Sequence, residues 1–177
     1  MPSTTIFTIG HSTRTLEELV GLLAAHGVRN LVDVRTIPKS QRHPHFAGEA
    51  LAVSLPAAGI SYHWMKALGG LRHPRPESPN DAWLNRSFRG YADHMQSAEF
   101  NEAVDDLVER GQGNDLAIMC SEAVPWRCHR SLIGDALLVR GVTVLDIMST
   151  TKAPAHKLTS FARVEGTNIT YPAAAED

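Results

Sequence analysis

The fold is decided by residues 5–35, TIFTIGHSTRTLEELVGLLAAHGVRNLVDVR. The first residues form an apolar, β-branched run that stops at Gly10, which is typical of a buried strand ending in a turn. Thr15 and Glu18 have the spacing of a capping box, and apolar residues then recur at helical spacing until Gly27. A second short apolar run ends in Asp33, so the segment predicts a strand, a helix and a second strand.

The same alternation continues along the chain. Three further helices are predicted, over residues 48–58, 97–111 and 132–141. Each is followed by a predicted strand, over residues 60–64, 116–119 and 142–147. Alternating elements of this kind predict an α/β protein in three layers, with a mainly parallel sheet of about five strands and helices on both faces. We expect one domain over residues 1–150 and a C-terminal extension over 151–177, partly packed on the domain and frayed at its end.

The segment 68–89 departs from this pattern. It is rich in glycine and proline and has no hydrophobic period, so we expect a long surface excursion. Loops of this length are uncommon in compact domains unless they have a function.

Charge and composition exclude several classes of protein. The 177 residues carry 17 Lys and Arg against 19 Asp and Glu, so the chain is not a polycation that coats nucleic acid or lipid. It has no apolar run long enough to cross a membrane and no secretory signal, so we expect a cytoplasmic protein with no membrane partner. Two cysteines cannot form a disulfide framework for a chain of this size.

Positive charge is nevertheless concentrated in one stretch. Residues 35–89 contain eight Lys or Arg and three acidic residues. Arginine binds phosphate or carboxylate through two parallel hydrogen bonds. The stretch therefore favours an anionic partner, either a small molecule or a nucleic acid.

Reactive residue types gather where the predicted strands end. They are Gly10-His11-Ser12, Asp33-Val34-Arg35, His63-Trp64, Cys120-Ser121-Glu122 and Asp146. Ligands of open α/β sheets bind at the carboxyl ends of the strands, because the turns that leave those ends meet there. We therefore expect these segments to surround one pocket.

The densest group is the segment from Cys120 to Arg130. A thiol at the end of a buried strand can be stabilised as a thiolate by nearby cations, here Arg127 and Arg130. Six residues separate Cys120 from Arg127, one more than in the loop of cysteine phosphatases, so we reject that identification. A phosphate site at the N-terminus of the helix that begins near Cys128 remains open.

Three other interpretations of the two cysteines stay open. Cys120, Cys128 and His129, with His11, could bind zinc, although there is no Cys-x-x-Cys motif. The two thiols could form a redox disulfide across the loop. Cys120 could also be a small buried residue without chemistry.

Six motifs resemble one known family. They are Thr8-Ile9-Gly10-His11-Ser12, Leu31-Val32-Asp33-Val34-Arg35 with Pro38 and Ser40, Gly59-Ile60-Ser61-Tyr62, Leu68-Gly69-Gly70-Leu71-Arg72, Tyr91-Ala92-Asp93-His94-Met95, and Met119-Cys120-Ser121-Glu122 with Cys128-His129-Arg130. In this order they resemble the family called domain of unknown function 488. The resemblance implies an α/β fold and a bacterial cytosolic protein, and it implies no activity.

The leading hypothesis is an enzyme that acts on a phosphorylated or nucleotide-like substrate, or on a base within a nucleic acid. Its candidate catalytic residues are Cys120 as nucleophile, His11 or His129 as proton carrier, and Glu122 or Asp33 as base or orienting carboxylate. Its candidate ligand-binding residues are Ser12, Arg35, Arg72, Arg127 and Arg130. The alternatives are a non-catalytic module that binds an anion or nucleic acid, and a thiol-redox or metal-binding protein. No residue is assigned as a metal ligand, and the residues do not define a cofactor.

Overall fold

A computed structural model of the chain describes residues 4–39, 41–70 and 72–173. Its centre is a sheet of β1 (Thr5–Gly10), β2 (Asn30–Asp33), β3 (Ser61–Trp64), β4 (Leu116–Cys120) and β5 (Thr143–Asp146), in the order β3-β2-β4-β1-β5. Every neighbouring pair in this sheet is parallel. The predicted α/β fold with a five-stranded parallel sheet is therefore confirmed, and β2, β4 and β1 are its central strands.

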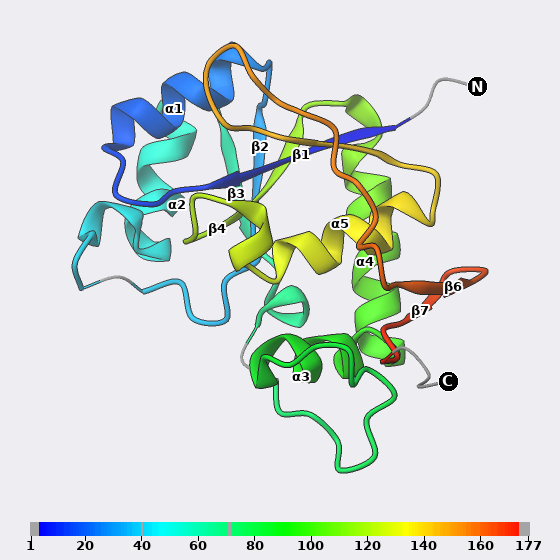
Figure 1. Cartoon of the computed structure of the whole chain (residues 1–177). Coiled ribbons are helices and arrows are strands. Elements are labelled where there is room, and N and C mark those ends of the chain that lie inside the picture. Colours follow the sequence, from blue (N-terminus) through cyan, green and yellow to red (C-terminus); the bar gives the residue numbers. More distant parts are fainter. Residues whose placement is uncertain (1–3, 40, 71, 174–177) are drawn as a thin grey trace.

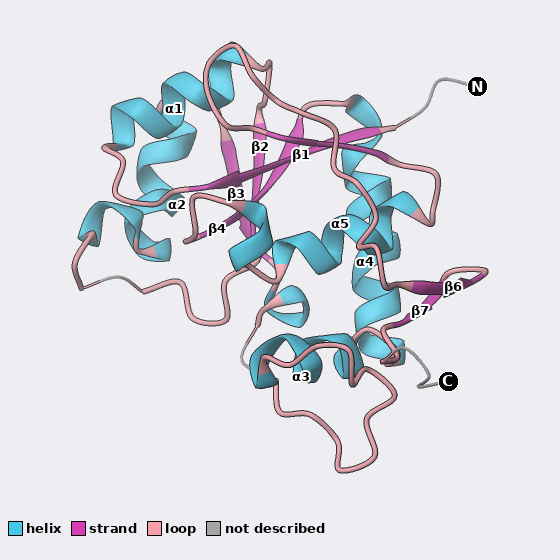
Figure 2. Cartoon of the chain, viewed as in Figure 1, coloured by secondary structure: helices cyan, strands magenta, loops and turns pink. Residues whose placement is uncertain are grey.

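Helices cover both faces of the sheet, as Figures 1 and 2 show. The helices α1 (Leu16–Ala25) and α2 (Gly48–Ala57) lie on one face, and α4 (Ala98–Arg110) and α5 (Arg130–Leu138) lie on the other. Successive side chains of β4 alternate between the two cores: Met119 packs with α1 and α2, whereas Cys120 packs with α4 and α5. The three-layer arrangement is confirmed.

The expected surface excursion is confirmed for most of residues 73–85, which are exposed or half-buried and lie outside helices and strands, but two features of 68–89 differ from it. A helix, α3 (Arg86–His94), begins inside it, and Asn80 within it is fully buried. The carboxylate of Asp93 on α3 accepts hydrogen bonds from the Ser78 hydroxyl, the Asn80 amide and the Arg75 backbone N–H. This polar network holds Arg75, Ser78 and Asn80 against α3, and hydrophobic periodicity does not detect an arrangement of this kind.

The C-terminal residues contribute to the core. An antiparallel hairpin of β6 (Arg163–Glu165) and β7 (Asn168–Thr170) places Ile169 and Tyr171 in the same hydrophobic cluster as α4 and α5. The Tyr171 hydroxyl donates a hydrogen bond to Asp135 on α5 at 2.8 Å. Most of the end expected to fray, residues 174–177, lies outside the described residues, as do Ser40 and Leu71 of the family motifs.

The longest helix in the described part of the chain, α4, has 13 residues. A helix needs about 20 apolar residues to cross a bilayer. Within residues 4–39, 41–70 and 72–173, no helix has the length and apolar character of a membrane span.

Candidate functional site

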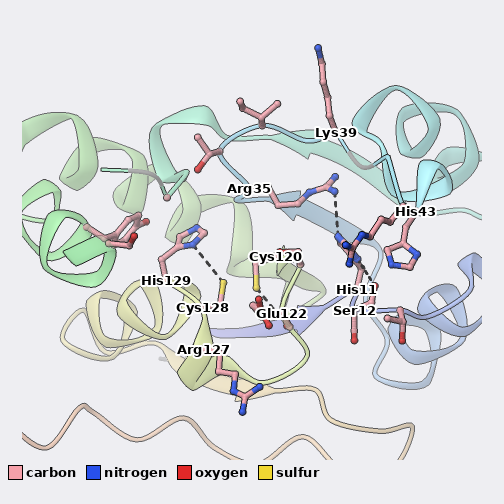
Figure 3. A pocket seen from close by; sticks show the side chains of 18 of the residues that line it. His11, Ser12, Arg35, Lys39, His43, Cys120, Glu122, Arg127, Cys128 and His129 are labelled. Carbon is pink, nitrogen blue, oxygen red and sulfur yellow. Dashed lines mark hydrogen bonds between the residues drawn. The ribbon is translucent and has the colours of Figure 1, made fainter. Parts of the chain in front are cut away.

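A pocket of about 820 Å³ opens at the carboxyl ends of the three central strands. Residues that follow β1, β2 and β4 line it, together with the start of α3 and with Thr36, Ile37, Lys39, Gln41, Arg42 and His43. Seven of the ten predicted site residues line this pocket: His11, Ser12, Arg35, Cys120, Glu122, Arg127 and His129. Figure 3 shows Lys39 and Arg127 at opposite edges, with Arg35, His11 and the two thiols between them.

Arg35 is held rigidly at the end of β2. Its Nε and Nη2 atoms donate to the carboxylate of Asp33, the shortest bond being 2.6 Å, and both side chains are buried. The hydroxyl of Tyr62 on β3 donates to the same carboxylate at 2.6 Å. Both carboxylate oxygens of Asp33 therefore accept hydrogen bonds from these partners, which fix the position of the Arg35 guanidinium.

His11 lies beside Arg35 and is neutral. Its Nδ1 atom bonds the Ser12 carbonyl at 2.9 Å, which places the proton on Nδ1 and leaves Nε2 as an acceptor for Arg35 Nη1 at 3.4 Å. Burial is the largest cause that lowers the pKa of His11, and together with the charge of Arg35 it brings the pKa to about 4. The ring stacks on Phe46 with 4.4 Å between the ring centroids, so its orientation is fixed.

The two thiols lie side by side at the bottom of the pocket (Figure 3) and interact with each other. Cys120 ends β4, and Cys128 precedes α5, so the loop 121–127 connects them. Burial raises the pKa of Cys120, but the hydrogen bond with Cys128 and the charge of Arg130 outweigh burial, so the pKa falls below that of an ordinary thiol. For Cys128, burial and the interaction with Cys120 raise the pKa well above that value. The pair is therefore asymmetric, with the thiolate favoured at Cys120.

His129 faces the second thiol. Its Nε2 atom donates to the Val34 carbonyl at 2.7 Å, so Nδ1 is the acceptor and lies 3.6 Å from Cys128 Sγ. Burial lowers the pKa of His129 to about 4, which keeps the ring neutral. His129 Nδ1 is therefore placed to accept a hydrogen bond from the Cys128 thiol.

Arg130, the first residue of α5, has an unusual environment. Its side chain is 1% exposed, its Nη2 donates to the Ala123 carbonyl at 3.1 Å, and its Nε and Nη1 have no hydrogen-bond partner among the described residues. No carboxylate within the described part of the chain forms an ion pair with it. Its charge acts on the two thiols, where it lowers the pKa of Cys120.

The remaining predictions fail to converge on this pocket. Arg72 is not among the lining residues, and its side chain donates to the carbonyls of Gly69 and Ala67. The ends of β3 and β5 also stay outside, because these are the edge strands of the sheet. Asp146, at the end of β5, instead lines a second cavity of about 510 Å³ together with His156.

Sequence reasoning assigned no role to several residues that line the pocket. Lys39 and Arg42 add two cations to its rim, and Tyr91 of α3 closes one side, with its hydroxyl donating to the Leu68 carbonyl at 2.8 Å. The excess of basic residues over 35–89 was the available signal for the two cations. Nothing in the sequence pattern placed α3 at the pocket.

The structure bears on two of the alternatives for the cysteines. Both thiols are free, so no disulfide joins them here. The described residues contain no group of three or more His, Cys, Asp or Glu side chains that could hold a metal ion. The zinc site of Cys120, Cys128, His129 and His11 is therefore not formed by these side chains.

The fold and the pocket define a class: a parallel α/β protein with two thiols and several cations at the carboxyl edge of its sheet. Residues 15–137 match the model of the family described as domain of unknown function DUF488. The match spans more than half of the chain, and the chain belongs to this family. No curated protein and no solved structure matches the chain.

Proposed function

We propose that the protein is an enzyme that uses the Cys120 thiolate as a nucleophile on an anionic substrate that carries a phosphate or a nucleotide. The proposal includes a cytoplasmic setting, where two free thiols persist in the reduced form. One observation carries it: a guanidinium that is 1% exposed, that of Arg130, acts on Cys120 and has no carboxylate partner among the described residues.

A buried cation needs a compensating anion, because leaving a charge alone in a medium of low polarity costs several kcal/mol. The thiolate form of Cys120 supplies that anion. A cysteine with no chemical role would gain nothing from a buried arginine and would be stable as a neutral thiol. The arrangement therefore supports a nucleophilic Cys120 over a merely structural one.

The rest of the pocket suits an anionic substrate. Arg35, Lys39, Arg42 and Arg127 supply four formal positive charges, whereas Glu122 supplies one negative charge among the described residues of the lining. Arg35 is fixed by Asp33, so it offers a preorganised contact for a phosphate oxygen. We assign Arg35 and Arg127 to anion binding, and His11 to accepting a hydrogen bond at Nε2 from the ligand or from Arg35.

In the reaction, the Cys120 sulfur forms a bond to the electrophilic atom of the substrate, and the bond to the leaving group breaks. Water then releases the group held on sulfur and restores the thiolate. Glu122 lines the pocket and is the carboxyl group available to give a proton to the leaving group and take one from the water.

The test combines labelling and turnover. Iodoacetamide should label Cys120 quickly at neutral pH, and inorganic phosphate should slow the labelling. A panel of p-nitrophenyl phosphate and nucleoside phosphates should contain a substrate that the wild type converts and Cys120→Ala does not. Arg127→Gln should weaken protection by phosphate, whereas Arg110→Gln, which removes an exposed arginine on α4, should not.

The same experiment separates the enzyme from a binding module. A binding module predicts that Cys120→Ala retains phosphate affinity and that no compound of the panel is converted, with an affinity that falls steeply with salt. Slow labelling of Cys120 without protection by phosphate would remove the thiol from the proposed role.

A further inference from the structure

The enzyme mechanism proposed above uses one thiol, yet the pocket contains two. Cys120 and Cys128 both line it, both are buried, and their side chains interact directly. They come from opposite ends of one loop, whose residues Ser121, Glu122 and Trp126 are exposed. A second thiol in contact with the first needs a role of its own.

The surroundings of the two thiols differ in a way that suits two successive steps. Cys120 has the buried guanidinium of Arg130 acting on it, which favours its thiolate. Cys128 remains protonated, with its sulfur 3.6 Å from the acceptor Nδ1 of His129. His129 cannot rotate freely, because its Nε2 is bonded to the Val34 carbonyl and its ring packs 4.8 Å from that of Tyr91.

We propose that Cys120 and Cys128 are a redox modification site, in which a peroxide oxidises Cys120 and Cys128 then resolves the product as a disulfide. In the first step, the Cys120 thiolate attacks hydrogen peroxide, the O–O bond breaks, and Cys120 sulfenic acid and hydroxide form. In the second step, Cys128 sulfur attacks the Cys120 sulfur, the S–O bond breaks, and the departing hydroxide leaves as water with the Cys128 proton, passed through His129 Nδ1. The peroxide gains two electrons and the two thiols lose two.

The disulfide has a physical consequence in this site. It removes the thiolate that compensates the Arg130 charge, so the oxidised form holds an uncompensated buried cation. We therefore expect a disulfide that a dithiol reduces readily and that shuts off the nucleophile without destroying it. The site would protect Cys120 from irreversible oxidation to the sulfinic acid.

This inference uses the thiolate of Cys120, which the proposed function also uses, but it requires no turnover and no anionic substrate. The experiment treats the reduced full chain with a small excess of hydrogen peroxide, blocks the remaining thiols with N-ethylmaleimide and digests with trypsin. Cleavage after Arg110, Arg127 and Arg130 places Cys120 in the peptide 111–127 and Cys128 in the peptide 128–130. The expected product is these two peptides joined by a disulfide and released by dithiothreitol.

Two variants test the order of the steps. Cys128→Ser should accumulate Cys120 sulfenic acid, which dimedone traps, and then the sulfinic acid. Cys120→Ser should leave Cys128 reduced at the same peroxide dose. Circular dichroism of each variant shows whether it is folded, and the joined wild-type peptides provide a readout that depends on neither variant.

Three results would overturn the inference: both thiols of the wild type remain open to N-ethylmaleimide, Cys120 passes to the sulfinic acid without a disulfide, or Cys128 is oxidised in Cys120→Ser. A disulfide that forms in a protein without phosphate protection or turnover would support this inference and contradict the proposed function. Phosphate protection and turnover without a disulfide would support the proposed function and contradict this inference.

Discussion

Arg35 Nη2 lies 2.6 Å from Asp33 Oδ2, and the two side chains are 7% and 0% exposed. Removing one member of a buried ion pair leaves an uncompensated charge, which costs about 3 kcal/mol or more. We expect Asp33→Asn to lower the free energy of unfolding by that amount and to weaken phosphate protection of Cys120. Urea denaturation and the labelling assay measure the two effects.

The matched control is Asp106→Asn. Asp106 forms an ion pair with Arg110 at 2.9 Å on the surface of α4, where the side chains are 48% and 43% exposed. Exposed pairs contribute at most about 1 kcal/mol. Equal losses of stability in the two variants would show that Arg35 does not depend on Asp33.

Gly10→Ala should disrupt the wall of the pocket. A Cβ atom on Gly10 would lie 1.5 Å from the Glu122 carbonyl oxygen, a contact between two backbone segments that no side-chain rotation relieves. The loop after Cys120 would have to move, so we expect a loss of about 3 kcal/mol together with loss of phosphate protection. In Gly21→Ala, by contrast, the new methyl group meets nothing within 4 Å on the exposed face of α1, and stability should rise by up to about 1 kcal/mol. Unchanged stability and protection in Gly10→Ala would contradict this account of the loop.

The stability of the protein should fall at alkaline pH through one histidine. His156 Nε2 lies 3.0 Å from Asp135 and its Nδ1 lies 3.4 Å from Asp146. Burial lowers its pKa, but the two carboxylates outweigh burial and raise the pKa to about 9. The folded state therefore holds this proton more tightly than the unfolded state, whose histidine titrates near 6.5.

The contribution of His156 is complete below pH 6.5 and is lost as the pH rises towards 9, with a slope of at most about 1.4 kcal/mol per pH unit. Thermal unfolding between pH 6 and pH 9.5 measures it. His156→Gln should remove this part of the pH dependence, whereas His63→Gln, on the exposed edge strand β3, should retain it. If the stability of His156→Gln depended on pH as that of the wild type does, another group would be responsible for the loss of stability at alkaline pH.

The sheet could be predicted from sequence because most of its strands are apolar and two of the helices between them, α1 and α4, begin with capping residues, Thr15 and Ser97. Thr15 and Glu18 form both bonds of the capping box, at 3.0 and 3.1 Å. Helix α3 was missed although its signals are present: Asn85 caps its N-terminus, and Phe88, Tyr91, Ala92 and Met95 recur at helical spacing. The residues before α3 escaped detection for another reason, because a polar network around Asp93 and Asn80 orders them. Sequence patterns predict only local structure, whereas this network joins side chains that are distant in sequence and that no sequence pattern pairs.

The sequence was sufficient to predict which residues form the candidate site, but it was not sufficient to predict the role of each residue. Polar residues at strand ends located His11, Arg35 and Cys120 in one pocket. The sequence could not indicate that Asp33 would be occupied by Arg35, or that Arg72 would bond to backbone carbonyls. Roles of this kind depend on side-chain directions and hydrogen-bond partners, which are set by tertiary packing.

The central claim is that Cys120 is a thiolate stabilised in a cationic pocket, and the pH dependence of its alkylation tests that claim most directly. Iodoacetamide labelling of the wild type, read separately in the peptides 111–127 and 128–130, gives a rate against pH for each thiol. We predict that the rate for Cys120 rises to its plateau below the ordinary thiol pKa of 9, and that the rate for Cys128 rises well above it. A Cys120 midpoint at or above that of Cys128 would contradict the account.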